Sequence, residues 1–315
     1  MTKISKDSKI YIAGHRGMVG SACWRLLKKK GYHNLILKTS KELDLRNQLE
    51  VYRLIEKVKP DVIINAAARV GGILANSKYP YEFLMDNMLI QNNLIKTAHE
   101  LDIKKFIFLG SSCIYPKMAP QPLMEEYLLT GLLEKTNQWY ALAKISGVKL
   151  IEALRVQYNR DYVSLMPTNL YGPGDNYDLE TSHVLPAMLR KFHEAKGNNH
   201  APVKLWGSGT PLREFLHVDD LAEAVVFSME NTLEESLYNV GSGEEITIKE
   251  LALLIQEIVG HEGEIIWDNS KPDGTPRKLM DSGQMNQLGW FSKINLKVGI
   301  NIIYKEFCKS SNHTY

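Results

Sequence analysis

A tyrosine and a lysine stand four residues apart, at Tyr140 and Lys144, and no other tyrosine of the chain has a lysine four residues after it. On a helix this spacing places both side chains on one face. The phenol could then donate a proton to a carbonyl oxygen, while the ammonium lowers the pKa of the phenol. Ser111 follows the apolar run 106–109, and its hydroxyl could hydrogen-bond the same carbonyl. These three residues predict the reduction of a ketone.

A second group of residues could bind a dinucleotide. The apolar run 9–13 leads into a seven-residue loop with a G-x-x-G-x-x-G spacing, and a helical pattern follows. Glycine allows a tight turn and lets backbone amides approach a pyrophosphate, which the positive end of a helix attracts. The loop consists of Gly14, His15, Arg16, Gly17, Met18, Val19 and Gly20. A strand before it and a helix after it favour a dinucleotide site.

The choice between NAD and NADP depends on the residue that follows the second strand. Sites for NAD usually place Asp or Glu there, to bind the ribose 2′-hydroxyl. This chain has Lys38 instead, and Arg16 lies within the glycine loop. Two cations favour the 2′-phosphate of NADP, while Asp44 and Leu45 could line the adenine pocket. We therefore predict NADP(H) as the cofactor.

The first half of the chain alternates two periodicities. Short β-rich runs occur at 9–13, 34–37, 61–65, 105–109 and 162–166, and the stretches between them have helical spacing. Strands separated by helices indicate a parallel sheet with helices on both faces and right-handed crossovers. The expected fold class is therefore α/β, with a doubly wound Rossmann domain. Its strand ends would carry Ser111 and the glycine loop to one ligand crevice.

The second half of the chain has a different residue pattern. Turn signals cluster at 171–175, 206–211 and 271–276, and helical patterns recur at 185–193, 221–229 and 248–259. We predict an NADP-binding domain from residues 1–170 plus roughly 214–240. A smaller α/β substrate-binding lobe would comprise residues 171–213 and 241–315. The polar tail after Cys308 is expected to fray.

The overall composition excludes several classes. With 38 basic and 36 acidic residues, the net charge of +2 provides no field for capturing nucleic acid or an anionic membrane. The first residues lack the apolar core of a signal peptide, and no apolar run approaches the roughly 18 residues that suggest a membrane span. Three scattered cysteines favour neither a disulfide framework nor a zinc site. We expect a cytoplasmic protein without a metal ion.

Together these features resemble an extended short-chain dehydrogenase/reductase. Five longer motifs, at 14–20, 110–116, 167–173, 206–211 and 271–278, are more narrowly similar to the GDP-L-fucose synthase family. The resemblance runs from about Ile10 to Trp290. It implies 3,5-epimerisation of GDP-4-keto-6-deoxy-D-mannose, followed by NADPH-dependent reduction of the 4-keto group to give GDP-L-fucose.

The resemblance also implies roles for particular residues. Cys113 and His183 would be the base and acid that invert carbons 3 and 5, whose protons the neighbouring ketone acidifies. Substrate contacts would come from Lys191, Trp206, Arg213 and Asp273. The cofactor-binding set would further include Ala66, Leu109, Gly110, Ser111, Ser112, Tyr140, Lys144, Pro167, Thr168, Asn169, Leu170 and His183. Two long helices, near 81–101 and 140–158, would pair two copies as a homodimer.

Other interpretations remain. A dehydratase or 4-epimerase that retains NAD would need an acid near position 38, and the dehydratases also place an acidic pair where this chain has Cys113 and Ile114. Another NADP(H)-dependent nucleotide-sugar epimerase/reductase would need only small changes in the second lobe, so the exact keto-sugar stays open. A non-catalytic NADP sensor of the same fold need not keep Tyr140 and Lys144.

Overall fold

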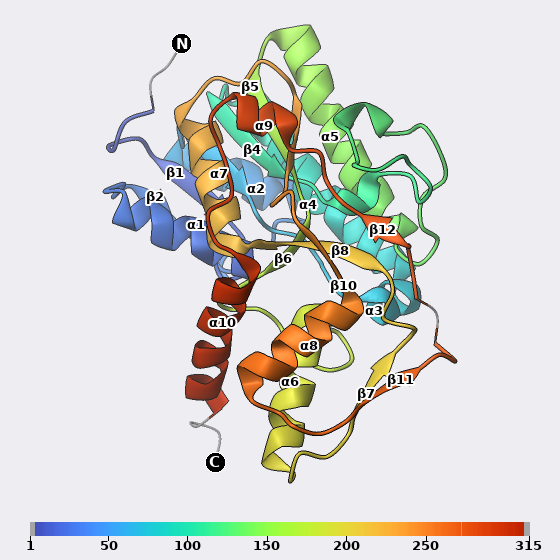
Figure 1. Cartoon of the computed structure of the whole chain (residues 1–315). Helices are drawn as coiled ribbons and strands as arrows, with labels where there is room; N and C mark the ends of the chain where they lie inside the picture. Colours follow the sequence, from blue (N-terminus) through green and yellow to red (C-terminus); the bar gives the residue numbers. More distant parts are fainter. Residues whose placement is uncertain (1–3, 272, 312–315) are drawn as a thin grey trace.

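The first half of the chain builds a parallel sheet. The computed structural model describes residues 4–271 and 273–311. Six strands lie in the order β2-β1-β3-β4-β5-β9, and each pair of neighbours is parallel (Figure 1). They are β1 (Ile10–Ala13), β2 (Leu35–Ile36), β3 (Val62–Asn65), β4 (Lys105–Leu109), β5 (Asp161–Pro167) and β9 (Leu237–Val240). The predicted doubly wound fold is confirmed.

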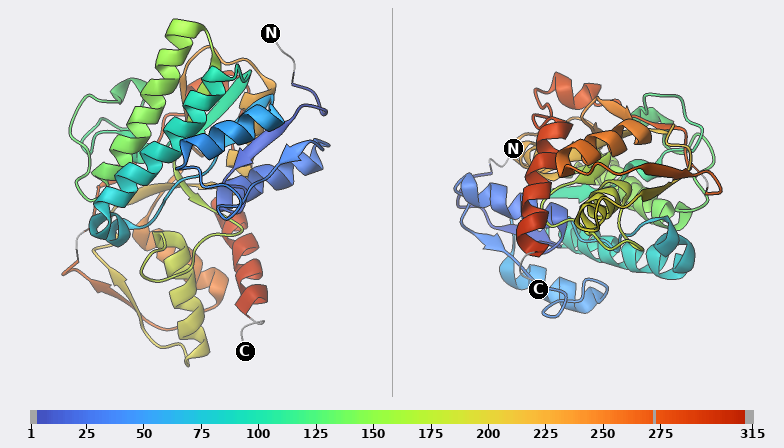
Figure 2. Two further views of the ribbon diagram at one scale, coloured as in Figure 1. Left: turned by 180° about the vertical axis from the view of Figure 1, so that it is seen from behind. Right: turned by 60° about the horizontal axis from the view of Figure 1, so that its bottom comes forward.

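Helices cover both faces of this sheet. One face carries α1 (Met18–Lys29) and α7 (Val218–Glu230); the other carries α2 (Gln48–Val58), α4 (Pro80–Glu100) and α5 (Gln138–Tyr158), with α4 and α5 side by side (Figure 2). Successive strand residues alternate between the two cores, with Ile10 and Ile12 in one and Tyr11 and Ala13 in the other. Because both faces are buried, the strands are nearly continuous apolar runs.

Short elements connect the strands near their carboxyl ends. They are α3 (Ile73–Lys78) and two 3₁₀ turns, η1 (Ser112–Ile114) and η2 (Glu125–Tyr127). The first turn follows β4 directly and carries Cys113. Among the described residues, no helix is long and apolar enough to cross a bilayer.

The second half packs around a third core below the sheet (Figure 1). Strand β8 (Leu212–His217) lies between β10 (Glu245–Thr247) and β12 (Arg277–Lys278) and also pairs with β6 (Asn169–Tyr171); β7 (Val203–Trp206) pairs with β11 (Ile265–Asp268). The helices are α6 (Val184–Gly197), α8 (Ile248–Val259), α9 (Gly283–Gln287) and α10 (Leu296–Ser311). Residues 283–290 return to the first core through Met285 and Trp290.

The expected fraying after Cys308 is wrong for residues 309–311. The tail after Cys308 does not fray at once, because α10 continues to Ser311. Ile300 and Ile303 are buried and hold α10 in the third core. This packing stabilises the helix up to its last turn. Residues 312–315 lie outside the described part of the chain.

Candidate active site

The glycine loop lies where the carboxyl end of β1 meets α1. Gly14 has a φ of 81°, and a Cβ there would stand 2.7 Å from the backbone nitrogen of Ala67. A Cβ on Gly20 would overlap the carbonyl oxygen of Gly14. Both positions therefore require glycine. The described structure gives the N-cap, Gly17, no side-chain hydrogen bond, and the first turn of α1 has no acidic residue. Its amides and dipole are available to a pyrophosphate.

The residues predicted to bind the adenosine end of the cofactor are basic. His15 is buried, and its imidazole lies near Arg16, Glu42 and the backbone of Lys38. Burial lowers the pKa of His15, and Arg16 lowers it further. The Nδ1 atom of His15 has no hydrogen-bond partner among the described residues. Lys38 pairs with Glu42 at 3.3 Å across the surface. A negatively charged polar ligand would complement the charges of Arg16 and Lys38 and would give His15 a hydrogen-bond partner.

The two residues predicted for the adenine pocket already have protein partners. Both carboxylate oxygens of Asp44 accept hydrogen bonds from Arg46, at 2.9 Å each, and this guanidinium lowers the pKa of Asp44. The carbonyl of Leu45 accepts from the side chain of Asn93 at 2.9 Å. Their contact with adenine stays a prediction.

Lys144 and Tyr140 lie at the start of α5, beside the end of β4. The Nζ atom of Lys144 is buried and donates to the carbonyl oxygen of Leu109 at 2.8 Å. It stands 5.7 Å from the centre of the Tyr140 ring. Burial lowers the pKa of Lys144 to about 8, although Cys113 opposes this shift. Tyr140 and Lys144 therefore lie together on one helix beside the end of β4, as their spacing predicted.

The expected lowering of the Tyr140 pKa is not seen. Burial raises the pKa of this phenol, and Cys113 raises it further. The ammonium of Lys144 bonds to a backbone carbonyl rather than to the phenol, so desolvation dominates. The phenol stays neutral at physiological pH, and this is the form that can donate a proton.

Ser111 and Cys113 share the tight turn after β4. The Oγ atom of Ser111 accepts a hydrogen bond from the backbone nitrogen of Cys113 at 3.4 Å. Cys113 is 9% exposed. Burial raises the pKa of its thiol, whereas Lys278, Ser111 and Lys144 act in the opposite direction. The thiol thus lies among groups that favour its thiolate.

His183 comes from the second half of the chain and lies within electrostatic reach of Lys278, which also acts on Cys113. It is the N-cap residue of α6, and the structure gives its side chain no capping hydrogen bond. Its ring is accessible to solvent. Desolvation lowers the pKa of His183, and the Lys278 ammonium lowers it further. A histidine with a lowered pKa is a stronger proton donor when charged.

Lys278 is the site residue whose role the sequence did not reveal. Its charge acts on Cys113 and on His183, so it lies within reach of both. Burial lowers the pKa of Lys278, Cys113 opposes this, and the neighbouring Arg213 adds to it. The only signal in the sequence is its place at the end of the 271–278 motif.

The four predicted substrate contacts fall into two groups. Arg213 lies opposite Lys278 in the β8–β12 pairing, and its charge acts on Lys278. Of the other three, Trp206 ends β7, Asp273 lies in the loop before β12, and Lys191 lies on α6. Trp206 is 55% exposed beneath Lys271, Asp273 accepts from Ser208 at 2.7 and 2.9 Å, and Lys191 donates to the Lys204 carbonyl at 3.1 Å. Pro272, which belongs to the 271–278 motif, lies outside the described residues.

The end of β5 closes the site on the other side. The backbone nitrogen of Gly110 donates to the carbonyl of Leu165 at 2.9 Å, which holds the ends of β4 and β5 together. Thr168 and Asn169 donate to the carbonyl of Glu214 at 3.4 and 2.8 Å. The remaining predicted cofactor contacts lie at or just after the ends of β3, β4 and β5 or in β6, and they are Ala66, Leu109, Ser112, Pro167 and Leu170.

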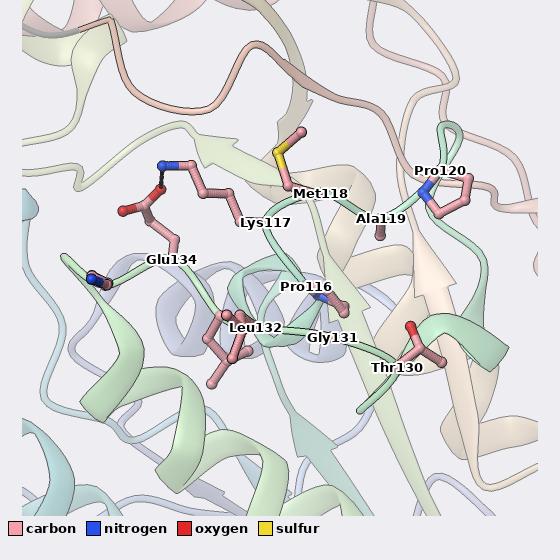
Figure 3. Close-up of a pocket in the computed structure, with 11 residues that line it drawn as sticks. Pro116, Lys117, Met118, Ala119, Pro120, Thr130, Gly131, Leu132 and Glu134 are labelled. Atoms are coloured by element: carbon pink, nitrogen blue, oxygen red, sulfur yellow. Dashed lines mark ion pairs between the residues drawn. The ribbon is translucent and has the colours of Figure 1, made fainter.

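A separate cavity opens beyond the active-site turn. It has a volume of about 530 Å³ and is lined by residues 116–120 and 130–135, with an ion pair of 2.7 Å between Lys117 and Glu134 (Figure 3). None of the predicted site residues lines it. Among the described residues no group of three or more His, Cys, Asp or Glu side chains could hold a metal ion.

The parallel sheet, the glycine loop at its carboxyl edge and the Ser111, Tyr140 and Lys144 set define a dinucleotide-dependent enzyme of the short-chain dehydrogenase/reductase class. Residues 10–241 match the NAD dependent epimerase/dehydratase family. A putative GDP-L-fucose synthase 2 of Arabidopsis thaliana is 55% identical over 307 residues, covering 98% of this chain and 94% of the relative. The GDP-L-fucose synthase of Escherichia coli K12 is 50% identical, covering 96% and 98%.

A solved structure agrees with these relatives. The GDP-L-fucose synthetase of Naegleria fowleri bound to NADP superposes with a TM-score of 0.89 at 27% identity, covering 99% of this chain and 97% of that one. The chain therefore belongs to the NAD dependent epimerase/dehydratase family and, within it, to the GDP-L-fucose synthase family. The resemblance of the motifs is confirmed, while the roles of the individual residues stay predictions.

Proposed function

We propose that this chain converts GDP-4-keto-6-deoxy-D-mannose to GDP-L-fucose, by inverting carbons 3 and 5 and then reducing the 4-keto group with NADPH. The observation that carries the proposal is the gathering of Cys113, Lys278 and His183 beside the Ser111, Tyr140 and Lys144 set. These residues would thus supply both a base–acid pair and a carbonyl-reducing set close to one another. A reductase without epimerisation would need only the second of these.

The inversions require a base on one face of the sugar and an acid on the other. The ketone acidifies the protons on carbons 3 and 5, so that each removal gives an enolate. Lys278 and Lys144 stabilise the Cys113 thiolate against the effect of burial, and the thiolate removes the proton. His183 returns a proton from its charged form. Ser111 and Tyr140 hydrogen-bond the oxygen that becomes negative.

The reduction uses the second set. Bound NADPH supplies hydride to carbon 4. Ser111 holds the ketone, and the neutral Tyr140 phenol, whose pKa burial raises, gives its proton to the alkoxide oxygen. Lys144, fixed on the Leu109 carbonyl, holds its ammonium 5.7 Å from the centre of the Tyr140 ring and would bind the nicotinamide ribose of the cofactor.

The residues present fit NADP(H). Gly14 and Gly20 let the loop pack tightly against Ala67 and against its own backbone, and the first turn of α1 presents its amides to a pyrophosphate. At the other end, Arg16 and Lys38 suit the 2′-phosphate, while the free Nδ1 of the buried His15 offers a hydrogen bond there. No acid occupies position 38, where an NAD site would have one.

Lys38→Ala is expected to lower the preference for NADPH over NADH by about tenfold, which corresponds to roughly 1.4 kcal/mol for one charge-assisted contact. The reason is that NADH has no 2′-phosphate for Lys38 to bind. The measurement is kcat/KM for both cofactors at one keto-sugar concentration. Lys41→Ala, three residues away on the same exposed loop, is the control. An unchanged preference in Lys38→Ala would remove Lys38 from the cofactor site.

We further propose a homodimer through α4 and α5. These helices pack against each other, and together they expose Tyr81, Met85, Leu89, Trp139, Leu142, Val156 and Tyr158. Val156 is 85% exposed, which a partner helix would cover. Four helices from two copies would then form a bundle. Sedimentation equilibrium of the intact chain checks this, and a monomer mass at micromolar concentrations would contradict it.

The proposed location is the cytoplasm, and we propose neither nucleic acid nor a membrane as partner. All three cysteines, Cys23, Cys113 and Cys308, are free, which suits a reducing compartment. The division into an NADP-binding domain and a substrate-binding lobe is likewise our proposal. Cell fractionation followed by immunoblotting checks the location.

Incubation of the protein with GDP-4-keto-6-deoxy-D-mannose in D₂O, with NADPH or NADH, tests the function. The expected product by NMR is GDP-L-fucose carrying deuterium at carbons 3 and 5. Reduction without deuterium would indicate a reductase that does not epimerise. Absence of turnover with this keto-sugar would favour a related nucleotide sugar, or a sensor that binds NADP only.

A further inference from the structure

Glu214 is a carboxylate buried inside β8, with no exposed surface. Its Oε1 atom accepts hydrogen bonds from the backbone nitrogen of Gly243 at 2.8 Å and from the hydroxyl of Ser242 at 3.4 Å. Its Oε2 atom accepts from the backbone nitrogen of Met280 at 2.9 Å. Burying a carboxylate costs free energy unless it is hydrogen-bonded. We therefore expect the Glu214 carboxylate to hold these three groups in place.

The fit around this carboxylate is tight. A Cβ on Gly241 would overlap Oε1 and would stand 3.0 Å from Oε2. The position of the carboxylate is thus set by the backbone on both sides, and its bonds cannot shift without moving the chain. The backbone carbonyl of Glu214 also receives Thr168 and Asn169, so the whole residue is anchored.

Met280 is the important partner, because it lies two residues after Lys278. Strand β12 has only two residues, and only Arg277 and Lys278 pair with β8. A two-residue strand has little intrinsic stability. The bond from Met280 to Glu214 continues the attachment of this segment past the end of the strand.

The opposite edge of the same segment contacts the chain that follows the active-site turn. Leu123 donates to the carbonyl of Leu279 at 2.7 Å and accepts from the nitrogen of Asp281 at 2.9 Å. The side chain of Gln121 accepts from the nitrogen of Leu279 at 2.9 Å. Residues 279–281 are therefore held between Glu214 on one side and residues 121–123 on the other.

This arrangement explains how Lys278 comes to lie beside Cys113. Residues 121–123 follow η1 along the chain, and Glu214 holds residues 279–281, which come directly after β12, against them. The groups that face the Cys113 thiol are Ser111, Lys144 and Tyr140, besides Lys278. Lys278 in turn faces Arg213 on β8 and His183 at the start of α6. Glu214 contacts none of the reacting groups. It holds residues 279–281, and these position Lys278.

We propose that Glu214 is a positioning residue for the epimerisation, which fixes Lys278 beside Cys113 through its bond to the backbone of Met280. The inference rests on the base role proposed for Cys113. It concerns the Glu214 side chain and proton transfer only, and a change of this side chain leaves the backbone carbonyl that receives Thr168 and Asn169, so cofactor binding should not change.

Glu214→Gln tests the proposal, because it keeps the size of the side chain and replaces one acceptor oxygen by an NH₂ group that faces a backbone N–H. The readout is the pH midpoint for alkylation of Cys113 by iodoacetamide, in the NADP-bound protein without sugar, with the modified residue identified by mass spectrometry. We expect the midpoint to rise by about one pH unit, as it should in Lys278→Met. The double variant Glu214→Gln/Lys278→Met should show no further rise, because both changes remove one interaction.

The sign of the shift separates positioning from a direct charge effect. Removing a nearby negative charge would by itself favour the thiolate and lower the midpoint. Displacing Lys278 does the opposite. A lowered or unchanged midpoint in Glu214→Gln, while Lys278→Met raises it, would overturn the proposal.

Two further variants control for loss of folding. Asp220→Asn alters another buried carboxylate, which accepts from the backbone nitrogen of Ile294 at 2.9 Å. It should lower the thermal midpoint without moving the alkylation midpoint, and a shift equal to that of Glu214→Gln would overturn the proposal. Gly241→Ala, which displaces the carboxylate but keeps its charge, should raise the alkylation midpoint.

Substrate kinetics complete the test. In Glu214→Gln, deuterium uptake from D₂O into the sugar should fall by about tenfold to a hundredfold, with the Kd for NADPH unchanged. Uptake at the normal rate would overturn the inference. If the wild-type protein took up no deuterium, the proposed function would fail instead, and the alkylation series would still report whether Glu214 positions Lys278.

Discussion

Tyr140→Phe is expected to slow NADPH oxidation with GDP-4-keto-6-deoxy-D-mannose by about 10³-fold, the scale on which a positioned general acid contributes. The change removes only the hydroxyl that protonates the alkoxide at carbon 4. The ring should stay in place, because it packs edge-on against Phe83 with centroids 6.4 Å apart. The Kd for NADPH and the thermal midpoint should therefore be unchanged.

The decline in nicotinamide absorbance measures this effect, and the fluorescence of bound NADPH checks cofactor affinity. Tyr158→Phe, at the exposed end of the same helix, is the matched control and should turn over normally. Deuterium uptake should persist in Tyr140→Phe, at a reduced rate, because Ser111 still contacts the ketone oxygen. Normal NADPH oxidation in Tyr140→Phe would mean that another group protonates carbon 4's oxygen.

Cys113→Ser should lower deuterium uptake at carbons 3 and 5 by about 10²- to 10⁴-fold, the range for loss of a general base. A serine hydroxyl is a far weaker acid than a thiol, so the cations that favour a thiolate here cannot produce an alkoxide at neutral pH. The variant should still bind NADPH, since Lys144 and the glycine loop are untouched.

The experiment follows deuterium uptake by NMR in D₂O without NADPH, so that reduction does not mask exchange. Cys308→Ser, far along the chain on α10, is the control and should exchange at the wild-type rate. Continued exchange in Cys113→Ser would assign the base to another residue. His183→Asn should then be compared, because loss of the acid leaves proton removal possible while blocking inversion.

Local patterns in the sequence were sufficient to predict most elements of the fold. The helix expected at 248–259 begins and ends at those residues. Thr247 and Glu250 form a capping box at its start, and Gly260 ends it with a φ of 71°. The central strands β1, β3, β4 and β5 were equally clear, because burial on both faces makes them nearly continuous apolar runs. Such signals lie within a few residues of one another, so the sequence contains them directly.

The sequence also predicted the reacting residues that the ends of parallel strands bring together. Ser111 follows β4, the glycine loop follows β1, and a doubly wound sheet carries both to one edge. Tyr140 and Lys144 are joined by helical spacing alone. Cys113 and His183, whose partners come from distant parts of the chain, were identified from the family resemblance rather than from pattern.

Only the tertiary structure decided the electrostatics of the site. Lys278 comes beside Cys113 and His183 through a two-residue strand, and Glu214 holds that strand from 64 residues earlier in the chain (278 against 214). The pKa of Tyr140 rises rather than falls, because desolvation outweighs the nearby ammonium. Burial and long-range pairing depend on the packing of the whole chain, and neither leaves a local periodicity that a sequence can show.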